Sequence, residues 1–266
     1  MKFTKMHGTG NDYVYVNCFA ENLPADERPA LAKQLSNRHF GVGGDGLICI
    51  GPSDAADFQM DMYNADGSRG LMCGNGIRCV GKYVYDRGLT DKTELKIETA
   101  SGVKTIWLNA EDGTVRSVRV DMGSPSFNLV RRPVEAAGQL WEVTDLSVGN
   151  HHAVLFLKED VDRLDLPRIG PAFEHHPLFP KGVNTEFVNV LGPARLKMRV
   201  WERGTGETLA CGTGATAVLA AANVCGLCGD SATVLLPGGE LFIEWDKAAN
   251  KLYMTGPAAT VFEGEI

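Results

Sequence analysis

The sequence predicts an α/β (α+β) fold of two similar domains, each with strands wrapped around a central helix. A Cys-Gly-x-Gly motif occurs twice, at Cys73 and at Cys211, with an offset of 138 residues. Other strand-like and helix-like stretches recur in the same order at offsets of about 132 to 139. The helix expected after Cys211 is apolar almost all round, so other elements must enclose it.

The first half of the chain alternates strand and helix signals. Tyr13 to Val16 are strong strand formers. Phe58, Met60 and Met62 alternate with polar residues, which is typical of a half-buried strand. Gly88 ends the helix that begins near Cys73. Expected strands are 3–6, 12–17, 47–50, 58–63, 94–98, 103–108 and 115–121, and expected helices are 29–38 and 73–86.

The second half repeats this order. Expected strands lie at 146–150, 152–157, 196–200 and 239–245, and expected helices at 167–176 and after Cys211. Trp201 precedes its cysteine by ten residues, as Tyr63 does. A repeat this long indicates two domains rather than a solenoid. We expect an N-terminal domain over residues 1–117 with a C-terminal strand 258–266, and a C-terminal domain over residues 118–257.

Composition excludes several classes of protein. The 266-residue chain carries a net charge of −7, which argues against a nucleic-acid partner that would need basic patches. No apolar run approaches membrane-spanning length, and the N-terminus has no signal core, so we expect a cytoplasmic protein without a membrane partner. Seven cysteines, an odd number, favour reduced thiols over a disulfide framework.

Each Cys-Gly-x-Gly motif predicts an anion site beside a thiol. The glycines are expected to let the backbone turn tightly, and the following helix directs N–H groups and partial positive charge toward the loop. A carboxylate held there has an acidified neighbouring carbon. A thiolate on one face of that carbon would remove its proton, and a thiol on the other would return one with inversion. No lysine lies in either loop to form a pyridoxal imine, so no cofactor is expected.

Longer motifs resemble a known family over essentially the whole chain. They are Met6-His7-Gly8-x-Gly10-Asn11-Asp12, Tyr63-Asn64-Ala65-Asp66-Gly67-Ser68, Met72-Cys73-Gly74-Asn75-Gly76-x-Arg78-Cys79, Glu202-Arg203-Gly204-x-Gly206-Glu207-Thr208-x-Ala210-Cys211-Gly212, Pro237-Gly238-Gly239 and Met254-Thr255-Gly256-Pro257. They closely resemble diaminopimelate epimerases. The resemblance implies two barrel-like sheets, each around a central helix, and a cofactor-free, metal-free enzyme. That enzyme would convert LL- to meso-diaminopimelate for lysine and peptidoglycan synthesis, as a cytoplasmic homodimer.

The resemblance also assigns roles to individual positions. Cys73 and Cys211 match the family's base and acid. Its reacting-carboxylate loops match Gly74, Asn75, Gly212 and Thr213. Its other substrate contacts match Asn11, Asn64, Asn150, Asn184, Glu202 and Arg203. The chain departs from some members at Gly46, where they carry glutamine.

Other interpretations remain open at this stage. A lone cysteine is more often a buried apolar residue than a nucleophile, and Cys18, Cys49 and Cys79 are interpreted so. Cys225 and Cys228 could be half a zinc site or a redox pair, but no second pair completes four zinc ligands. His152 could tune a catalytic thiol or be a satisfied histidine. Alternative functions are a relative acting on another amino acid, such as a histidine racemase, a non-catalytic anion-binding protein, and a thiol–disulfide oxidoreductase.

Overall fold

The computed structural model describes all 266 residues. The chain forms two compact units. The first unit comprises Met1–Val120 and Gly256–Ile266, and the second comprises Asp121–Thr255. The C-terminal segment thus belongs with the N-terminal half of the chain.

In the first unit, strands precede and follow the long helix α2 along the chain. Its elements are β1 (Lys2–Gly8), β2 (Asn11–Asn17), α1 (Arg28–Ser36), β3 (Gly46–Gly51), β4 (Phe58–Asn64), β5 (Arg69–Gly70), α2 (Gly74–Asp86), β6 (Glu94–Thr99), β7 (Gly102–Glu111), β8 (Thr114–Gly123) and β18 (Ala259–Glu265). Strand β1 lies between β2 and β18, antiparallel to both. Strand β2 runs parallel to β3, which is antiparallel to β4, and β4 runs parallel to β6.

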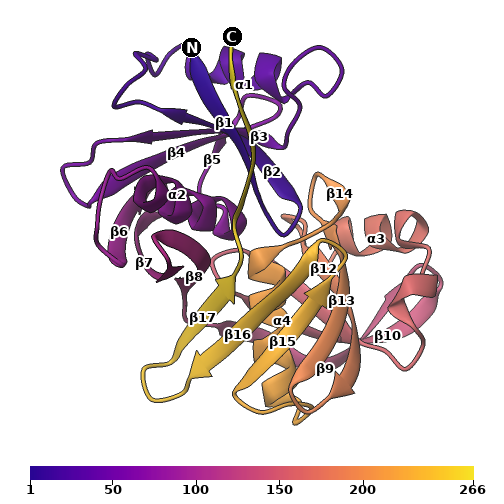
Figure 1. Ribbon diagram of the computed structural model, residues 1–266. Coiled ribbons are helices and arrows are strands. Elements are labelled where there is room, and N and C mark those ends of the chain that lie inside the picture. Colours follow the sequence, from indigo (N-terminus) through magenta and orange to yellow (C-terminus); the bar gives the residue numbers. More distant parts are fainter. The chain divides into compact units, whose positions relative to one another are not determined.

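The two helices of the first unit cover different faces of its strands (Figure 1). Helix α1 packs on the face that carries Val14, Val16 and Leu47. Helix α2 contacts β1, β2 and β7 and is buried along most of its length. A side chain at Gly81 would meet the side chains of Ile106 and Leu108, so glycine lets α2 approach β7 closely.

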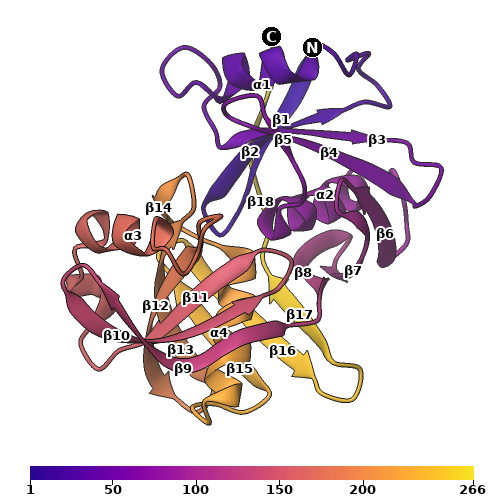
Figure 2. The same cartoon turned by 180° about the vertical axis from the view of Figure 1, so that it is seen from behind.

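The second unit repeats this arrangement. Its elements are β9 (Ser126–Ala136), β10 (Gln139–Ser147), β11 (His151–Phe156), η1 (Val161–Arg163), α3 (Leu166–Glu174), β12 (Asn184–Gly192), β13 (Arg195–Glu202), β14 (Gly206–Thr208), α4 (Gly212–Val224), β15 (Ser231–Leu236), β16 (Gly239–Asp246) and β17 (Lys251–Gly256). Strand β10 lies between β9 and β11, antiparallel to both, and β11 runs parallel to β12. Figure 2 shows α4 among these strands, and it contacts β10, β11, β12, β15 and β16.

The repeat extends to strand register. Leu47 pairs with Tyr63 in the first unit, and Thr185 pairs with Trp201 in the second. Both pairs are related by the offset of 138 residues that separates the two cysteines. Helices α2 and α4 have 13 residues each. The predicted α/β (α+β) fold, in which a sheet surrounds a central helix twice, is confirmed.

Some predicted boundaries are wrong. The strand expected at 146–150 is the end of a longer strand, β10, which stops at Ser147, and Val148 to Asn150 form the turn into β11. Strands β9, β12, β15 and β17 are absent from the prediction. Most residues of β9 are exposed, and Arg131, Arg132 and Pro133 interrupt its apolar alternation. Helix α3 accommodates Pro171 and ends at Glu174. None of the helices is both long and apolar enough to cross a membrane.

Candidate active site

Cys73 is the residue that caps the N-terminus of α2. Its backbone is extended, with φ −127° and ψ 117°, and its Sγ accepts a hydrogen bond of 3.3 Å from the backbone N–H of Gly76. The Cys73 thiol donates to Asn11 Oδ1 at 3.1 Å. The predicted pair of Cys73 and Asn11 is therefore in direct contact. A cysteine at this position lies beside N–H groups of the first helical turn, which have no partner within the helix.

Two residues that sequence reasoning did not single out complete the surroundings of Cys73. The hydroxyl of Tyr13 hydrogen-bonds the Cys73 sulfur. Burial, followed by the charges of Cys73 and Asp45, raises the pKa of Tyr13 well above its ordinary value. Asp45 accepts a 2.7 Å hydrogen bond from Asn11 Nδ2, which orients the Asn11 oxygen toward the thiol. We call Cys73, Asn11, Tyr13 and Asp45 the first thiol site.

A buried guanidinium supports the loop that contains Cys73. Arg78 is completely buried, and its Nη1 donates to Gly74 O at 3.3 Å and to Asn75 Oδ1 at 2.8 Å. Its Nη2 donates to Thr9 Oγ1 at 3.2 Å, and its Nε to Pro257 O at 3.1 Å. Burial lowers the pKa of Arg78, yet an arginine stays protonated in proteins. The side-chain oxygen of Asn75 is thus already engaged by this network.

Asn64 and Gly46 face each other across β3 and β4. Asn64 is half-buried, and its Nδ2 donates to Ser68 Oγ at 3.0 Å. A Cβ at Gly46 would lie 2.1 Å from Tyr63 O and 2.8 Å from the ring of Tyr13. A side chain larger than that of glycine therefore has no room at position 46 of this chain.

Cys211 occupies the same place in the second unit. It caps the N-terminus of α4 with φ −117° and ψ 108°, and its Sγ accepts from the N–H of Gly214 at 3.3 Å. The hydroxyl of Thr213 lies 3.4 Å from the sulfur. Cys211 is only 6% exposed, whereas Cys73 is half-buried.

Two carboxylates set the charge around Cys211. Burial first, and then the charges of Glu202 and Glu186, raise the pKa of Cys211 well above its ordinary value. The hydrogen bonds from Thr213 and Gly214 oppose this effect without cancelling it. Glu202 in turn accepts a hydrogen bond from Thr208 Oγ1. Burial and the two carboxylates therefore both favour the neutral form of the Cys211 thiol.

His152 and Glu186 form a buried pair beside this thiol. Both side chains are completely buried, and His152 Nδ1 lies 2.6 Å from Glu186 Oε1. His152 Nε2 lies 3.0 Å from Asn150 Oδ1, so the histidine connects a predicted substrate contact to the carboxylate. A Cβ at Gly214 would lie 2.6 Å from Glu186 Oε1, which places this carboxylate directly against the Cys211 loop. We call Cys211, His152, Glu186 and Glu202 the second thiol site.

Asn184 and Arg203 lie together in the second unit. Asn184 Oδ1 accepts a 2.9 Å hydrogen bond from the backbone N–H of Arg203, and its Nδ2 donates to His151 O at 3.1 Å. The Arg203 side chain is exposed and donates one hydrogen bond, from Nη1 to Lys181 O at 3.0 Å. Its position leaves guanidinium N–H groups for a ligand carboxylate.

The glycines of the two motifs were expected to allow a tight backbone turn, but the structure gives them a different role. Gly74, Gly76, Gly212 and Gly214 all have negative φ, so the loops need no left-handed backbone. The second glycine of each motif is instead required by close packing. A Cβ at Gly76 would lie 2.7 Å from Ile48 Cδ1, and one at Gly214 would meet Glu186.

Cys225 and Cys228 lie at the other end of α4 from Cys211. Cys225 follows the last turn of the helix, and its sulfur lies 3.5 Å from Thr144 Oγ1. The Cys228 thiol donates to Gly229 O at 3.3 Å, and burial raises its pKa to about 11. A C-terminal helix end disfavours a thiolate, unlike the N-terminal ends that hold Cys73 and Cys211. No cluster of three or more His, Cys, Asp or Glu side chains is arranged to bind a metal ion.

Comparison with known proteins identifies relatives along the whole chain. The family model described as "Diaminopimelate epimerase" matches residues 3–128 and 145–261. A diaminopimelate epimerase from Acetivibrio thermocellus is 54% identical over 279 residues, covering 100% of this chain and 98% of the relative. Diaminopimelate epimerases from Desulfovibrio desulfuricans and Methanococcus maripaludis are 53% and 51% identical, with all of this chain and 98% and 99% of the relatives covered.

Solved structures share the fold at low sequence identity. A phenazine biosynthesis protein of the PhzF family from Bacillus anthracis has a TM-score of 0.78 at 17% identity, with 100% of this chain and 98% of that chain covered. A hydroxyproline epimerase from Agrobacterium vitis, with bound trans-4-hydroxy-L-proline, has a TM-score of 0.72 at 16% identity, covering 100% and 90%. The family model and the relatives with more than half of their residues identical lead to one conclusion: the chain belongs to the diaminopimelate epimerase family.

Proposed function

We propose that the protein is an epimerase that interconverts LL- and meso-diaminopimelate in lysine and peptidoglycan precursor synthesis. The observation that carries the proposal is the placement of Cys73 and Cys211. Each caps the N-terminus of a 13-residue helix at the matching position of a repeated unit. The full-length identity to diaminopimelate epimerases supports the choice of substrate.

The proposed reaction removes the proton from one face of the α-carbon and delivers a proton to the opposite face. One cysteine, as thiolate, takes the α-proton, and the electron pair left on carbon delocalises into the substrate carboxylate. N–H groups at the helix N-termini stabilise the charge that develops there. The other cysteine, as thiol, delivers a proton to the opposite face and becomes a thiolate. The product has inverted configuration, and each proton-transfer group contributes about 10²–10⁴-fold to the rate.

The charge around Cys211 suggests a direction for this exchange. Burial, and then the charges of Glu202 and Glu186, favour the thiol form of Cys211, which is the form that acts as the acid. Cys73 is then assigned as the base, which acts after it loses the proton that its thiol donates to Asn11 Oδ1 in this structure. In the reverse direction the roles exchange, because each turnover transfers the negative charge from one sulfur to the other. His152 lies 2.6 Å from Glu186 and fixes the position of that carboxylate beside the Cys211 loop.

The substrate contacts are assigned by their chemistry. Backbone N–H groups of Gly74, Asn75, Gly212 and Thr213 are proposed to bind the reacting carboxylate at the two helix N-termini. Arg203 is proposed to bind the distal carboxylate through a two-pronged hydrogen bond. The ammonium groups need acceptors, which Glu202 and side-chain amides provide. The amides proposed to contact substrate are Asn11, Asn64, Asn150 and Asn184.

Three further properties are part of the proposal. Proton transfer by two thiols requires no metal or organic cofactor, and no lysine lies in either loop to hold pyridoxal phosphate. The family resemblance favours the cytoplasm. It also favours a homodimer, which size-exclusion chromatography with light scattering would test.

The direct test uses solvent hydrogen exchange. Reduced protein is incubated with LL-diaminopimelate in deuterated water, and the products are separated by stereochemistry and analysed for deuterium. The expected result is meso-diaminopimelate carrying one deuterium at the inverted carbon. Histidine and lysine serve as controls for a racemase of another amino acid. Faster inversion of either control than of diaminopimelate would reject the assigned substrate.

A further inference from the structure

A second pair of thiols lies far along β2 and β3 from the first thiol site. Cys18 follows the last residue of β2, and its N–H donates to Ile50 O at 2.8 Å. Cys49 lies in β3, where it pairs with Val16 in the parallel ladder. Val16 and Cys18 are two residues apart, so Cys18 and Cys49 project from the same face of the sheet. A Cβ at Gly51, on that face of β3, would lie 3.7 Å from the Cys18 Cβ.

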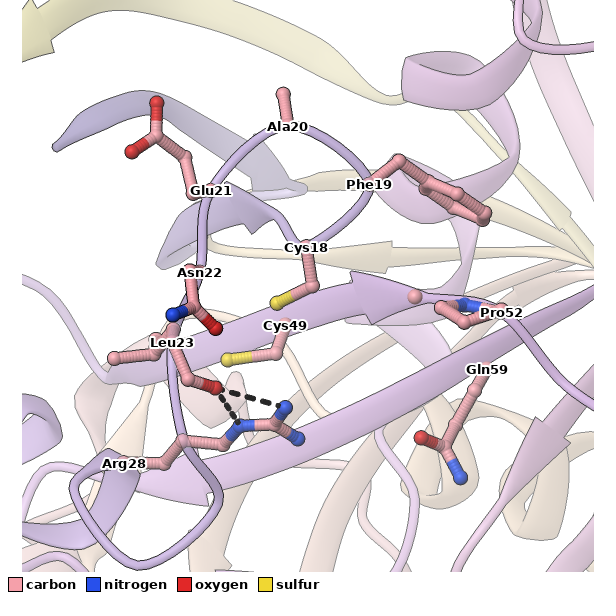
Figure 3. Close-up of a pocket in the computed structure, with 11 residues that line it drawn as sticks. Cys18, Phe19, Ala20, Glu21, Asn22, Leu23, Arg28, Cys49, Pro52 and Gln59 are labelled. Carbon is pink, nitrogen blue, oxygen red and sulfur yellow. Dashed lines mark hydrogen bonds between the residues drawn. The ribbon is translucent and has the colours of Figure 1, made fainter.

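The two sulfur atoms share the wall of an open cavity of about 430 Å³. Figure 3 shows Cys18 above Cys49, with both sulfur atoms on the side of Asn22 and Leu23. Cys49 is 2% exposed, whereas Cys18 is half-buried. A small molecule that enters the cavity therefore reaches Cys18 before Cys49. Nothing in the proposed epimerase reaction uses this cavity.

A fixed guanidinium lies beside the pair. Arg28 donates from Nη1 to Asp61 Oδ2 at 2.8 Å, and from Nε and Nη2 to Leu23 O at 3.2 and 3.1 Å. These bonds hold its positive charge near both sulfur atoms. The negative charges of Asp61 and Glu21 act in the opposite direction on Cys18.

The surroundings shift the pKa values of the two thiols in opposite directions. A hydrogen bond with Cys49 lowers the pKa of Cys18 to about 7, with a further contribution from Arg28 and against the effect of burial. The same hydrogen bond and burial raise the pKa of Cys49. Cys18 is thus partly thiolate at neutral pH, and Cys49 remains a thiol that hydrogen-bonds it. A low-pKa, accessible thiolate beside a second thiol is the arrangement found at oxidisable cysteine sites.

We propose that Cys18 and Cys49 form an oxidisable dithiol, in which Cys18 reacts with small peroxides and Cys49 resolves the product. In the first step the Cys18 thiolate attacks one oxygen of the peroxide. The O–O bond breaks, Cys18 becomes a sulfenic acid, and an alcohol or water leaves after taking up a proton. In the second step Cys49 sulfur attacks Cys18 sulfur, which expels water and forms the disulfide. The protein loses two electrons, and the peroxide gains them.

Local structure permits the small movement that bond formation needs. A disulfide requires the two Cβ atoms to lie within about 3.5–4.5 Å. Cys18 is followed by a turn in which Ala20 N–H bonds Asn17 O at 3.1 Å, and Phe19 is half exposed. Cys18 lies at the end of its strand and Cys49 within the ladder, so the movement that forms the bond falls on the side of Cys18.

Peptide mapping distinguishes this pair from the catalytic thiols. Trypsin cleaves after Lys5, Lys33, Arg38 and Arg69 but not at Arg28-Pro29, so Cys18 and Cys49 fall in separate peptides with one cysteine each, 6–33 and 39–69. The reduced full-length protein is treated with one equivalent of hydrogen peroxide at pH 7 and then alkylated. We expect the linked pair of peptides, with a mass two hydrogen atoms below the sum, and its loss after reduction by dithiothreitol.

Three variants assign the roles. Cys49→Ser should leave a sulfenic acid on Cys18 that dimedone traps, and Cys18→Ser should leave Cys49 reduced. Cys228→Ser is the matched control, since Cys228 is also half-buried but has a raised pKa. In wild-type protein at pH 7, iodoacetamide should label Cys18 at least about tenfold faster than Cys228. Epimerase activity, followed in parallel, separates this chemistry from oxidation of Cys73 or Cys211.

Two results would overturn the proposal. One is a Cys18 that stays reduced while other cysteines of the same sample are oxidised, because the pair would then have no special reactivity. The other is a Cys18 sulfenic acid that persists in wild-type protein without the linked peptides, because Cys49 would then not resolve it. Neither result depends on whether the protein epimerises diaminopimelate.

Discussion

The first and second thiol sites have the same backbone but different electrostatic surroundings. Cys73 and Cys211 both cap a helix and both accept a hydrogen bond of 3.3 Å from the N–H three residues later. Near Cys73 the direct contacts are a neutral amide, Asn11, and a phenol, Tyr13, and the carboxylate of this site, Asp45, bonds Asn11. Near Cys211 two carboxylates act on the sulfur. The repeat therefore fixes where each thiol lies, while the neighbouring strands determine its charge.

The same contrast appears one helical turn further along. Arg78 and Thr216 occupy equivalent positions, and each bonds the first carbonyl of its helix, Gly74 O at 3.3 Å and Gly212 O at 2.8 Å. Arg78 adds a buried positive charge beneath the first thiol site, and Thr216 adds none. A two-base reaction needs an acid and a base, and identical surroundings would not distinguish them. The difference between the two units is consistent with that requirement.

Removal of either thiol should have the largest effect. Cys73→Ala and Cys211→Ala should each lower the epimerisation rate by at least about 10³-fold, because inversion needs a proton-transfer group on both faces. Each variant should still eliminate halide from a β-halo analogue, since elimination needs one base only. Steady-state assays of both reactions check this, with Cys228→Ala as the cysteine control. Near-normal epimerisation by either single variant would reject the two-thiol mechanism.

Replacement of Arg78 should have the next largest effect, on the free energy of unfolding. Arg78→Thr removes the hydrogen bonds to Asn75, Thr9 and Pro257 and leaves a cavity, so we expect a loss of about 3 kcal/mol or more in the free energy of unfolding. Thr216→Val keeps the shape at the equivalent position of the second unit and removes one hydrogen bond, which should cost about 1 kcal/mol. Urea unfolding measures both. Equal losses would show that Arg78 does not support its loop more than Thr216 does.

Arg203→Ala should impair binding more than chemistry. The distal carboxylate does not change charge in the reaction, so loss of the guanidinium should raise KM about 10–100-fold, with a smaller decrease in kcat. Steady-state kinetics with LL-diaminopimelate measures both parameters. As a matched comparison, wild-type enzyme is tested with lysine, because this substrate lacks the distal carboxylate while the enzyme keeps Arg203. An unchanged KM in the variant would remove Arg203 from the substrate site.

Most of the fold could be predicted because the chain contains its pattern twice. A strand that is ambiguous alone, such as 196–200, becomes clear beside its counterpart at 58–63. Strand β9 escaped prediction because Arg131, Arg132 and Pro133 interrupt any apolar alternation. Its place in the sheet depends on pairing with β10, a contact between neighbouring strands that residue periodicity does not reveal.

The site was harder to predict where a residue has two plausible explanations. Cys73 and Cys211 stand out through the repeat, but Tyr13 lies in a run of strand formers and was assigned to the strand alone. Glu186 lies between Thr185 and Phe187, both completely buried, so it belongs to a strand that is covered on both faces. A glutamate within such an apolar strand indicates a functional residue, although it is not among the predicted site residues. Its contact with His152 becomes evident only when β11 and β12 are paired.

The smallest expected effect is that of replacing Glu186. The negative charge of Glu186 favours the neutral form of Cys211 and so raises its pKa. Glu186→Gln keeps the shape and the hydrogen bond from His152 but removes the charge, so the pKa of Cys211 should fall. At a fixed pH below that pKa, a larger thiolate fraction should then accelerate alkylation of Cys211 by roughly three- to thirtyfold. Cys73, measured in the same sample by peptide mapping, should keep its rate.

Glu207→Gln is the matched control, because Glu207 lies in the same unit and pairs with Arg199 at 2.7 Å instead of acting on Cys211. The experiment compares alkylation rates of both cysteines across a pH series in wild-type protein and the two variants. If Glu186→Gln leaves the Cys211 profile unchanged, burial alone sets the state of that thiol. If Cys73 shifts equally, the variant has altered general access to the thiols. Only a shift confined to Cys211 would show that the second unit uses its buried carboxylate to make one of two equivalent cysteines the acid.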